Sequence, residues 1–284
     1  MTDQLRRRPF AQVDVFSREP HMGNPVAVVL DGTDLSDQDM ARFARWTNLS
    51  ETTFVLPPTS PDADYRLRIW TPGGELPFAG HPTLGSAHAW REAGNAARSG
   101  DVIVQECAAG LVEIRPTNDG ALTFAAPPTS RSGNFDPAML EQVKAGLGLD
   151  DEEIVAHQWV DNGPGWAAVL LPSAADVLAI EPDYPALGNY KVGVVGPYPE
   201  GSPQQFEVRA FVTGTGGYED PVTGSLNASL AQWLMRTGRA PSSYVAQQGT
   251  AMERRGRVTV TSDAHGNVWV GGDCTTSISG SALL

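Results

Sequence analysis

The sequence predicts an α+β protein of two similar halves, each combining many strands with one principal helix. Short apolar or alternating segments rich in Val, Ile, Phe and Trp recur along the 284 residues, and such segments are typical of strands. Few stretches show the spacing of a helix. One order of strand, loop and helix occurs twice, which indicates two halves built on a common plan.

The first half contains seven expected strands separated by turn residues. They are residues 12–16, 25–30, 52–56, 65–70, 101–104, 111–114 and 122–125. A first helix is expected to open at Ser36, because Ser36 and Asp39 have the spacing of a capping box. A second helix is expected from about Pro82 to Glu92.

A polar, proline-rich stretch at residues 126–134 marks the boundary between the halves. Beyond it we expect helices at residues 137–147 and 221–235, and strands at residues 166–171, 191–195, 206–211, 257–261 and 268–270. The predicted domains are therefore residues 1–125 and 126–284, and the last strand could return to the first domain.

The charge and the hydropathy pattern argue against nucleic-acid and membrane partners. The formal net charge of −13 repels polyanions, and the basic groups at residues 6–8 and 254–257 are not interleaved with stacking aromatic side chains. No apolar run approaches the roughly 20 residues of a spanning helix. The N-terminal segment does not read as a signal peptide. We expect a cytoplasmic protein that binds a small molecule.

Neither a disulfide nor a metal site is indicated. Cys107 and Cys274 are far apart and have no nearby partner residues at zinc-binding spacing, so we expect two reduced, largely buried thiols. His81 and His88 are separated by about 10.5 Å of helical rise, which is too far to share one ion. No metal and no cofactor is expected.

The internal repeat locates the candidate chemistry. His81-Pro-Thr-Leu-Gly-Ser and Asp220-Pro-Val-Thr-Gly-Ser each follow a strand and a loop and open a helix. Because proline is favoured at the first helical position, His81 and Asp220 are the expected cap residues. Helix starts supply unpaired N–H groups and partial positive charge, which suit a carboxylate or an enolate-like charge. If the halves face each other, His81 and Asp220 would lie on opposite sides of a ligand.

Glu51 is a third candidate, since it adds a carboxylate among polar residues where a helix ends and a strand begins. From the pattern alone, a solvated carboxylate at Glu51 and purely structural caps at His81 and Asp220 remain open alternatives.

Seven motifs, in order and spread over nearly the whole chain, resemble the phenazine-biosynthesis PhzF-like family. They are Asp14-Val-Phe, Gly23-Asn-Pro-Val-Ala-Val-Val-Leu, Asn48-Leu-Ser-Glu-Thr-Thr-Phe, Pro77-Phe-Ala-Gly-His-Pro-Thr-Leu-Gly, Glu219-Asp-Pro-Val-Thr-Gly-Ser, Gln248-Gly-Thr-Ala-Met and Val270-Gly-Gly. Each motif is weak alone, but together they are specific.

The resemblance implies a fold similar to diaminopimelate epimerase. That fold has two pseudo-symmetric domains, each a curved mixed sheet wrapped around a central helix, with the active site in the cleft between them. The implied activity is that of a cofactor-independent isomerase, similar to trans-2,3-dihydro-3-hydroxyanthranilate isomerase, which moves a proton between carbons of a small carboxylate-bearing metabolite. A homodimer is the common state of the family.

The resemblance also implies roles for individual residues. Glu51 falls on the family's essential glutamate, and His81 and Asp220 fall on its other catalytic positions. The positions implied to bind substrate are Gly80, Thr223, Gly224 and Ser225. Glu51 would move the proton, His81 would shuttle or donate one, and Asp220 would orient an amine or hydroxyl. Diaminopimelate epimerase has cysteines where this chain has His81 and Asp220, so a two-thiol mechanism is not expected.

Three other functions are alternatives to the isomerase. A hydrolase using Ser225 would need the flanking glycines of a nucleophile elbow, which are missing. A dinucleotide-binding loop at residues 214–219 would need a last glycine, where Glu219 stands. The serious alternative is a catalytically silent PhzF-like protein that binds a small molecule or acts as a scaffold. Residues 70–75 and 212–218 depart from the family pattern, so the substrate is not identified.

Overall fold

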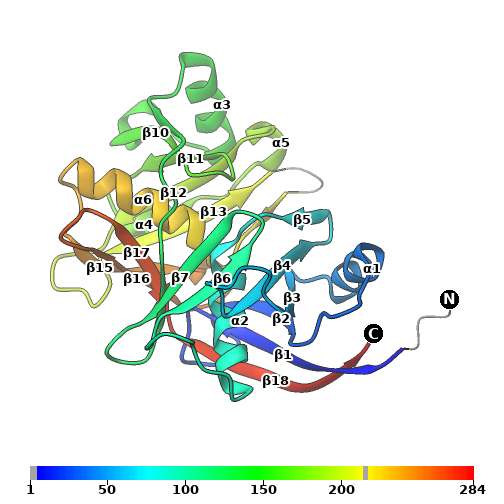
Figure 1. Cartoon of the computed structure of the whole chain (residues 1–284). Coiled ribbons are helices and arrows are strands. Elements are labelled where there is room, and N and C mark those ends of the chain that lie inside the picture. Colours follow the sequence, from blue (N-terminus) through cyan, green and yellow to red (C-terminus); the bar gives the residue numbers. More distant parts are fainter. Residues whose placement is uncertain (1–4, 214–216) are drawn as a thin grey trace. The chain divides into compact units, whose positions relative to one another are not determined.

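The protein divides into two compact units in the computed structural model, which describes residues 5–213 and 217–284 (Figure 1). The first unit is Met1–Ala125 with Gly271–Leu284, and the second unit is Ala126–Val270. Part of the glycine-rich segment at residues 212–218, singled out from the sequence, lies outside the described residues.

The first unit contains two helices and most of the strands that the sequence predicts. Its elements are β1 (Arg7–Val15), β2 (Asn24–Val29), α1 (Asp37–Thr47), β3 (Thr52–Leu56), β4 (Tyr65–Thr71), β5 (Gly74–Leu76), α2 (Gly80–Glu92), β6 (Ile103–Cys107), β7 (Gly110–Pro116), β8 (Leu122–Ala125) and β18 (Cys274–Leu283). All seven strands expected in this half are confirmed, and β5 and β18 are additional.

The strands of the first unit form a mixed sheet. β1 lies between β18 and β2 and is antiparallel to both. β2 pairs in parallel with β3, which is antiparallel to β4. β4 pairs in parallel with β6, and antiparallel β7 and β8 follow. The short β5 is a second, antiparallel partner of β4. The C-terminal strand of the chain is therefore part of the first unit's sheet.

The second unit holds the remaining elements, except for the last two residues of β17, which belong to the first unit. They are β9 (Arg131–Gly133), α3 (Pro137–Leu147), a 3₁₀ turn (Asp151–Glu153), β10 (Ala156–Asp161), β11 (Trp166–Leu170), α4 (Ala174–Ala179), α5 (Tyr184–Leu187), β12 (Lys191–Pro197), β13 (Phe206–Val212), β14 (Tyr218–Glu219), α6 (Gly224–Arg236), β15 (Ser243–Gln248), a 3₁₀ turn (Thr250–Met252), β16 (Gly256–Ser262) and β17 (Val268–Gly272).

The second unit repeats the pairing pattern of the first. β9, β10 and β11 are successively antiparallel, and β11 is parallel to β12. β12 is antiparallel to β13, β13 is parallel to β15, and β15 is antiparallel to β16. The short β14 is a second partner of β13, as β5 is of β4. In each unit the principal helix follows this short strand, so the internal repeat seen in the sequence corresponds to a repeated topology.

The helices of the second unit cover both faces of its sheet. Gly193 of β12 packs closely against Leu226 of α6. The neighbouring Val192 and Val194 belong to a core cluster with Met139 of α3. Because successive side chains of a strand point to opposite faces, α6 and α3 lie on opposite faces.

The principal helix of the first unit is buried along almost its whole length. α2 packs against β1, β2, β3, β4, β8 and β18. Gly85 allows the closest approach, because a Cβ there would lie 2.4 Å from Cγ1 of Val26 and 2.9 Å from Cγ2 of Val15. The expected α1 is also confirmed, with the predicted capping box between Ser36 and Asp39.

The prediction that His81 and Asp220 cap their helices is wrong. The cap residue of α2 is Ala79, which places His81 inside the first turn. The cap residue of α6 is Thr223, so Asp220 lies in the preceding loop. The two similar sequences therefore begin their helices at different points. The proline of the repeat lies in the first turn of α2, but it precedes the start of α6. Neighbouring side chains, described below, hold the segment before α6 in a non-helical conformation.

Replacing Gly85 with alanine is expected to destabilise the protein. The gain in helix propensity is about 1 kcal/mol, but the added methyl would overpack a core that has no space for it, at a cost of about 1–3 kcal/mol. We therefore expect the free energy of unfolding, measured by urea denaturation, to fall by about 1 kcal/mol, the middle of the roughly 0–2 kcal/mol that remains after the gain is subtracted. Gly280→Ala in β18 is the control, because a Cβ there meets no atom within 4 Å. Equal stability of the two variants would contradict the close packing.

Candidate active site

Glu51 lies in the short connection between α1 and β3. The helix ends at Thr47, and its cap residue Asn48 adopts a left-handed conformation with φ of 53°, which turns the chain toward the sheet. The carbonyl of Glu51 accepts a hydrogen bond of 3.4 Å from the amide of Ala27 in β2. This bond continues the parallel pairing of β2 with β3, and it leaves the Glu51 side chain only 15% exposed.

His81 brings a second predicted catalytic side chain to Glu51. Its imidazole is 7% exposed, and Nε2 lies 3.3 Å from Oε2 of Glu51. The ring also makes a hydrogen bond to the backbone of Pro25. Because proline has no N–H, the imidazole must donate this bond to the carbonyl. Since Nε2 faces Glu51, the donor is Nδ1.

The segment that carries this carbonyl is itself held in place. Asp14 in β1 is buried, and its Oδ2 accepts a hydrogen bond of 3.0 Å from the amide of Gly23. Asp14 also pairs with Pro25 across β1 and β2. The motifs around Asp14 and Gly23 therefore fix the acceptor that orients His81.

The environment of His81 favours the neutral imidazole. Burial lowers the pKa of His81 to about 3, and the hydrogen bond to Pro25 opposes this shift. A carboxylate on Glu51 would also oppose it, because a nearby negative charge favours the imidazolium. With the one proton of the neutral ring on Nδ1, Nε2 presents a lone pair to Glu51. Once Glu51 carries a proton, its carboxylic acid can therefore donate a hydrogen bond to this lone pair.

Asp220 belongs to a hydrogen-bonded group in the second unit. The hydroxyl of Thr223 donates to Oδ2 of Asp220 at 2.5 Å. The Gln248 amide donates to the carbonyl of Asp220 and to Oγ1 of Thr223, each at 3.0 Å. These bonds satisfy polar groups of the segment before α6 in a non-helical conformation, so the helix does not extend back to Asp220.

Ser225 lies in the first turn of α6 beside an indole. Nε1 of Trp166 donates to Oγ of Ser225 at 3.0 Å, and Nδ2 of Asn162 donates to its carbonyl at 3.1 Å. Because an indole N–H can only donate, the serine oxygen is the acceptor in the first bond and its own hydrogen can serve another acceptor. Gly224 begins α6 and is buried, as is Gly80 at the start of α2.

The predicted site residues are thus found in two groups. Glu51, His81 and Gly80 lie in the first unit, whereas Asp220, Thr223, Gly224 and Ser225 lie in the second. Four residues in these groups were not predicted as site residues, namely Pro25, Asn162, Trp166 and Gln248. Pro25 and Gln248 stand inside motifs that carried the resemblance, and that was the available signal. Nothing in the sequence indicated Trp166 or Asn162.

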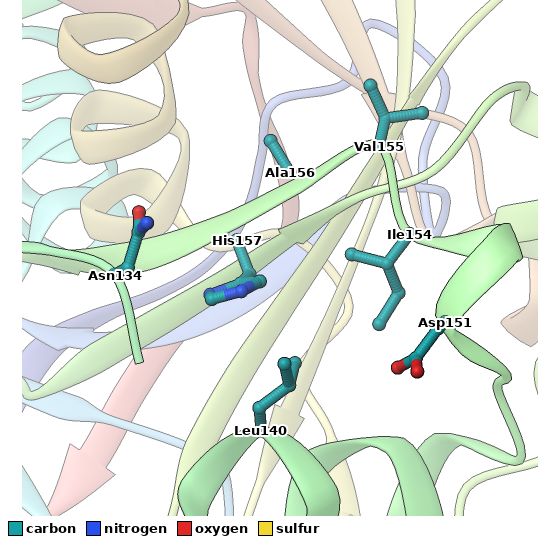
Figure 2. A pocket seen from close by; sticks show the side chains of 7 residues that line it. All are labelled: Asn134, Leu140, Asp151, Ile154, Val155, Ala156 and His157. Atoms are coloured by element: carbon teal, nitrogen blue, oxygen red, sulfur yellow. The ribbon is translucent and has the colours of Figure 1, made fainter. Parts of the chain in front are cut away.

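Two pockets lie elsewhere in the units. One of about 370 Å³ in the second unit is lined by Asn134, Leu140, Asp151, Ile154, Val155, Ala156 and His157 (Figure 2). Another of about 900 Å³ in the first unit is lined by Leu5, Arg6, Arg8, Asp34, Leu35, Ser36, Gln38, Asp39, Arg42, Phe43, Trp46, Leu283 and Leu284. Neither lining includes a predicted site residue.

The cysteines and possible metal ligands are distributed as follows. Both cysteines are free thiols, Cys107 buried and Cys274 half-buried, and burial raises the pKa of both. Within residues 5–213 and 217–284, no group of three or more His, Cys, Asp and Glu side chains could hold a metal ion. No helix in those ranges has the length and apolar character needed to cross a membrane.

Comparison with known proteins assigns the family. Residues 13–280 match the family described as phenazine biosynthesis-like protein. The chain belongs to this family. A PhzF-family protein from Bacillus anthracis has a similar structure, with a TM-score of 0.85 at 23% identity over 98% of this chain and 100% of that chain. This agreement confirms the predicted α+β fold.

Two relatives are similar to this chain over most of their length. Trans-2,3-dihydro-3-hydroxyanthranilate isomerase of Pseudomonas aeruginosa is 35% identical over 90% of this chain and 91% of its own. Antisense-enhancing sequence 1 of Schizosaccharomyces pombe is 38% identical over 99% of this chain and 100% of its own. Several relatives are named isomerases, and the protein is an isomerase of the PhzF-like family.

The buried imidazole is expected to make stability depend on pH. Because the pKa of His81 is about 3 in the folded protein and about 6.5 when unfolded, the unfolded chain alone gains this proton as pH falls from 6.5 toward 3. Stability is therefore lost over that window. At pH 5 the loss is about 2 kcal/mol. Urea denaturation at pH 7 and pH 5 should show a smaller loss in His81→Gln. Replacing the exposed His265 with Gln is the control, and equal losses in both variants would refute the assignment.

Proposed function

We propose that this isomerase moves a proton from one carbon to another of a small carboxylate-bearing metabolite, by acid–base catalysis and without a cofactor. The observation that supports it best is the Glu51–His81 pair, whose reactive atoms lie 3.3 Å apart in a largely buried setting. A carboxylate beside a neutral imidazole can take up, hold and return one proton.

In the proposed mechanism Glu51 is the base. Its carboxylate takes a proton from a C–H bond of the substrate. The electron pair of that bond stays on the substrate, where it is delocalised over the neighbouring double bond. The carboxylic acid so formed donates a hydrogen bond to Nε2 of His81 and then returns the proton to a different carbon. The carboxylate is regenerated, a double bond has changed position, and no electrons are gained or lost. The negative charge passes from Glu51 to the substrate and back to Glu51, and this scheme requires neither a metal nor an oxidant.

The second unit is proposed to hold the substrate. Ser225 accepts a hydrogen bond from Trp166, so its hydroxyl hydrogen can be donated to a substrate carboxylate. The first amides of α6, beginning at Gly224, would add hydrogen-bond donors and partial positive charge. Asp220, which accepts from Thr223, would accept a further bond from a substrate amine or hydroxyl. Gly80 would let the substrate approach the start of α2.

The proposed substrate class is based on the names of similar proteins. We infer that a dihydro-hydroxyanthranilic acid, or a similar small acid with an amine or hydroxyl, is the substrate, because relatives 35–36% identical are named for that reaction. The homodimer and the cytoplasmic location expected from the sequence remain part of the proposal. The dimer can be tested by light scattering on the purified chain.

A second function has some support. A relative 38% identical over its full length bears a name that mentions no reaction, and a PhzF-like protein could bind a small acid without converting it. Such a protein would show a saturable rise in melting temperature with the ligand, but no deuterium would enter the ligand at carbon.

The decisive variant is Glu51→Gln, which keeps the shape of the side chain and removes the base. With trans-2,3-dihydro-3-hydroxyanthranilic acid in D₂O, the unmodified protein is expected to change the ultraviolet spectrum and to incorporate deuterium at carbon, as followed by NMR. In Glu51→Gln, turnover should fall by about 10²–10⁴. Replacing the exposed Glu181 with Gln is the control. Near-normal turnover by Glu51→Gln would eliminate the mechanism.

A further inference from the structure

We propose that Gln248 is a positioning residue, which orients the hydroxyl of Thr223 as a hydrogen-bond donor to the carboxylate of Asp220. The inference deepens the proposed function, and it rests on that function only where turnover is measured. Asp220 is taken there as the group that orients the substrate. Gln248 acts on it through Thr223 and through the backbone.

The orientation of the Gln248 amide is determined by its neighbours. Gln248 ends β15 and is 0% exposed. Its Oε1 accepts from the backbone amide of Thr223 at 3.0 Å and from Nδ2 of Asn227 at 2.8 Å. Both neighbours present N–H groups, which can only donate. The side-chain oxygen must therefore face them, and Nε2 must face the other way.

Asn227 is oriented by the same reasoning. Its Nδ2 also donates to the backbone carbonyl of Thr223 at 2.9 Å, and a carbonyl can only accept. The nitrogen of Asn227 therefore lies between two oxygens. This fixes the direction of the Asn227–Gln248 bond independently of Thr223's hydroxyl.

The Thr223 hydroxyl then has one direction left for its hydrogen. Nε2 of Gln248 donates to Oγ1 of Thr223 at 3.0 Å, so that oxygen is an acceptor on the Gln248 side. Its own hydrogen points to Oδ2 of Asp220, 2.5 Å away. The same Nε2 donates to the backbone carbonyl of Asp220 at 3.0 Å. Gln248 thus holds both the backbone and, through Thr223, the carboxylate of Asp220.

This arrangement matters for the chemistry of Asp220. A carboxylate that accepts a hydrogen bond is favoured over its protonated form, and it remains an acceptor for a substrate N–H or O–H. If the Thr223 hydroxyl turned away, Asp220 would keep a proton up to higher pH and would then present a donor instead. A residue that only supported the loop would change stability without changing this titration.

Two variants separate these explanations. Gln248→Met keeps the length of the side chain and removes all of its hydrogen bonds. Thr223→Val is milder, because it removes only the hydroxyl and leaves the bond that the backbone amide of residue 223 donates to Oε1 of Gln248. The matched control is Gln205→Met: Gln205 also accepts from a backbone amide, that of Val245 at 2.9 Å, and donates to the carbonyl of Ser202.

The first measurement does not depend on turnover. The carboxyl ¹³C signal of Asp220, assigned with Asp220→Asn, is titrated by NMR in the unmodified protein and in each variant. We expect the midpoint to rise by about one pH unit in both Thr223→Val and Gln248→Met, and to stay unchanged in Gln205→Met. An unchanged midpoint in folded Thr223→Val would overturn the proposal, even if Gln248→Met failed to fold.

The second measurement uses turnover of trans-2,3-dihydro-3-hydroxyanthranilic acid. Each single variant is expected to lower kcat roughly tenfold and to move the acidic limb of the kcat profile to higher pH. The double variant should lose little more than either single variant, because both act through one hydroxyl. Additive losses of kcat would contradict the proposal that both side chains act through the Thr223 hydroxyl. If the unmodified protein converts no substrate, the proposed function fails, and the ¹³C titration still decides the role of Gln248.

Discussion

The burial of the first turn of α2 is the constraint on which the candidate site depends. A buried imidazole cannot rely on water, so its protonation and its orientation are decided by the few polar atoms that reach it. For His81 these are the carbonyl of Pro25 and the carboxyl group of Glu51. Both belong to the neighbouring strands β2 and β3 or to the segment before them. The pairing of these two strands therefore sets the geometry of the Glu51–His81 pair.

The two units share one topology but carry different groups of side chains at the start of the principal helix. In each, a short strand and a loop lead into a buried helix, but the helix starts differ. In the first unit, the helix begins at Gly80, and His81 enters the packed interior with a nitrogen facing a carboxylate. In the second unit, Gln248 and Thr223 satisfy the loop with directed hydrogen bonds, and the helix begins only at Gly224. The starts of the two principal helices thus carry different arrangements, a buried acid–imidazole pair in the first unit and a fixed polar framework in the second.

Sequence reasoning succeeded where a single local property decides the structure. The strands rich in Val, Ile and Phe were found because alternation and apolar runs reflect burial directly. β18, with the sequence CTTSISGSAL, was not predicted as a strand, because its residues are mostly small or polar and partly exposed. Its pairing with β1 joins the two ends of the chain, and no local pattern indicates such a partner. The helix caps were predicted wrongly because the preference for proline at the first helical position depends only on residues adjacent in sequence. The start of α6 is instead influenced by Gln248, which binds Thr223 from 25 residues away.

By itself, the sequence determined the α+β class, the internal repeat and the motifs that contain Glu51, His81 and Asp220, because these depend on composition, periodicity and order along the chain. The tertiary structure alone decided that His81 is a neutral ring with its lone pair toward Glu51, and that Ser225 accepts from Trp166. These properties depend on burial and on donors and acceptors contributed by distant segments. Protonation and hydrogen-bond direction are set by that surrounding shell, which exists only once the chain has folded.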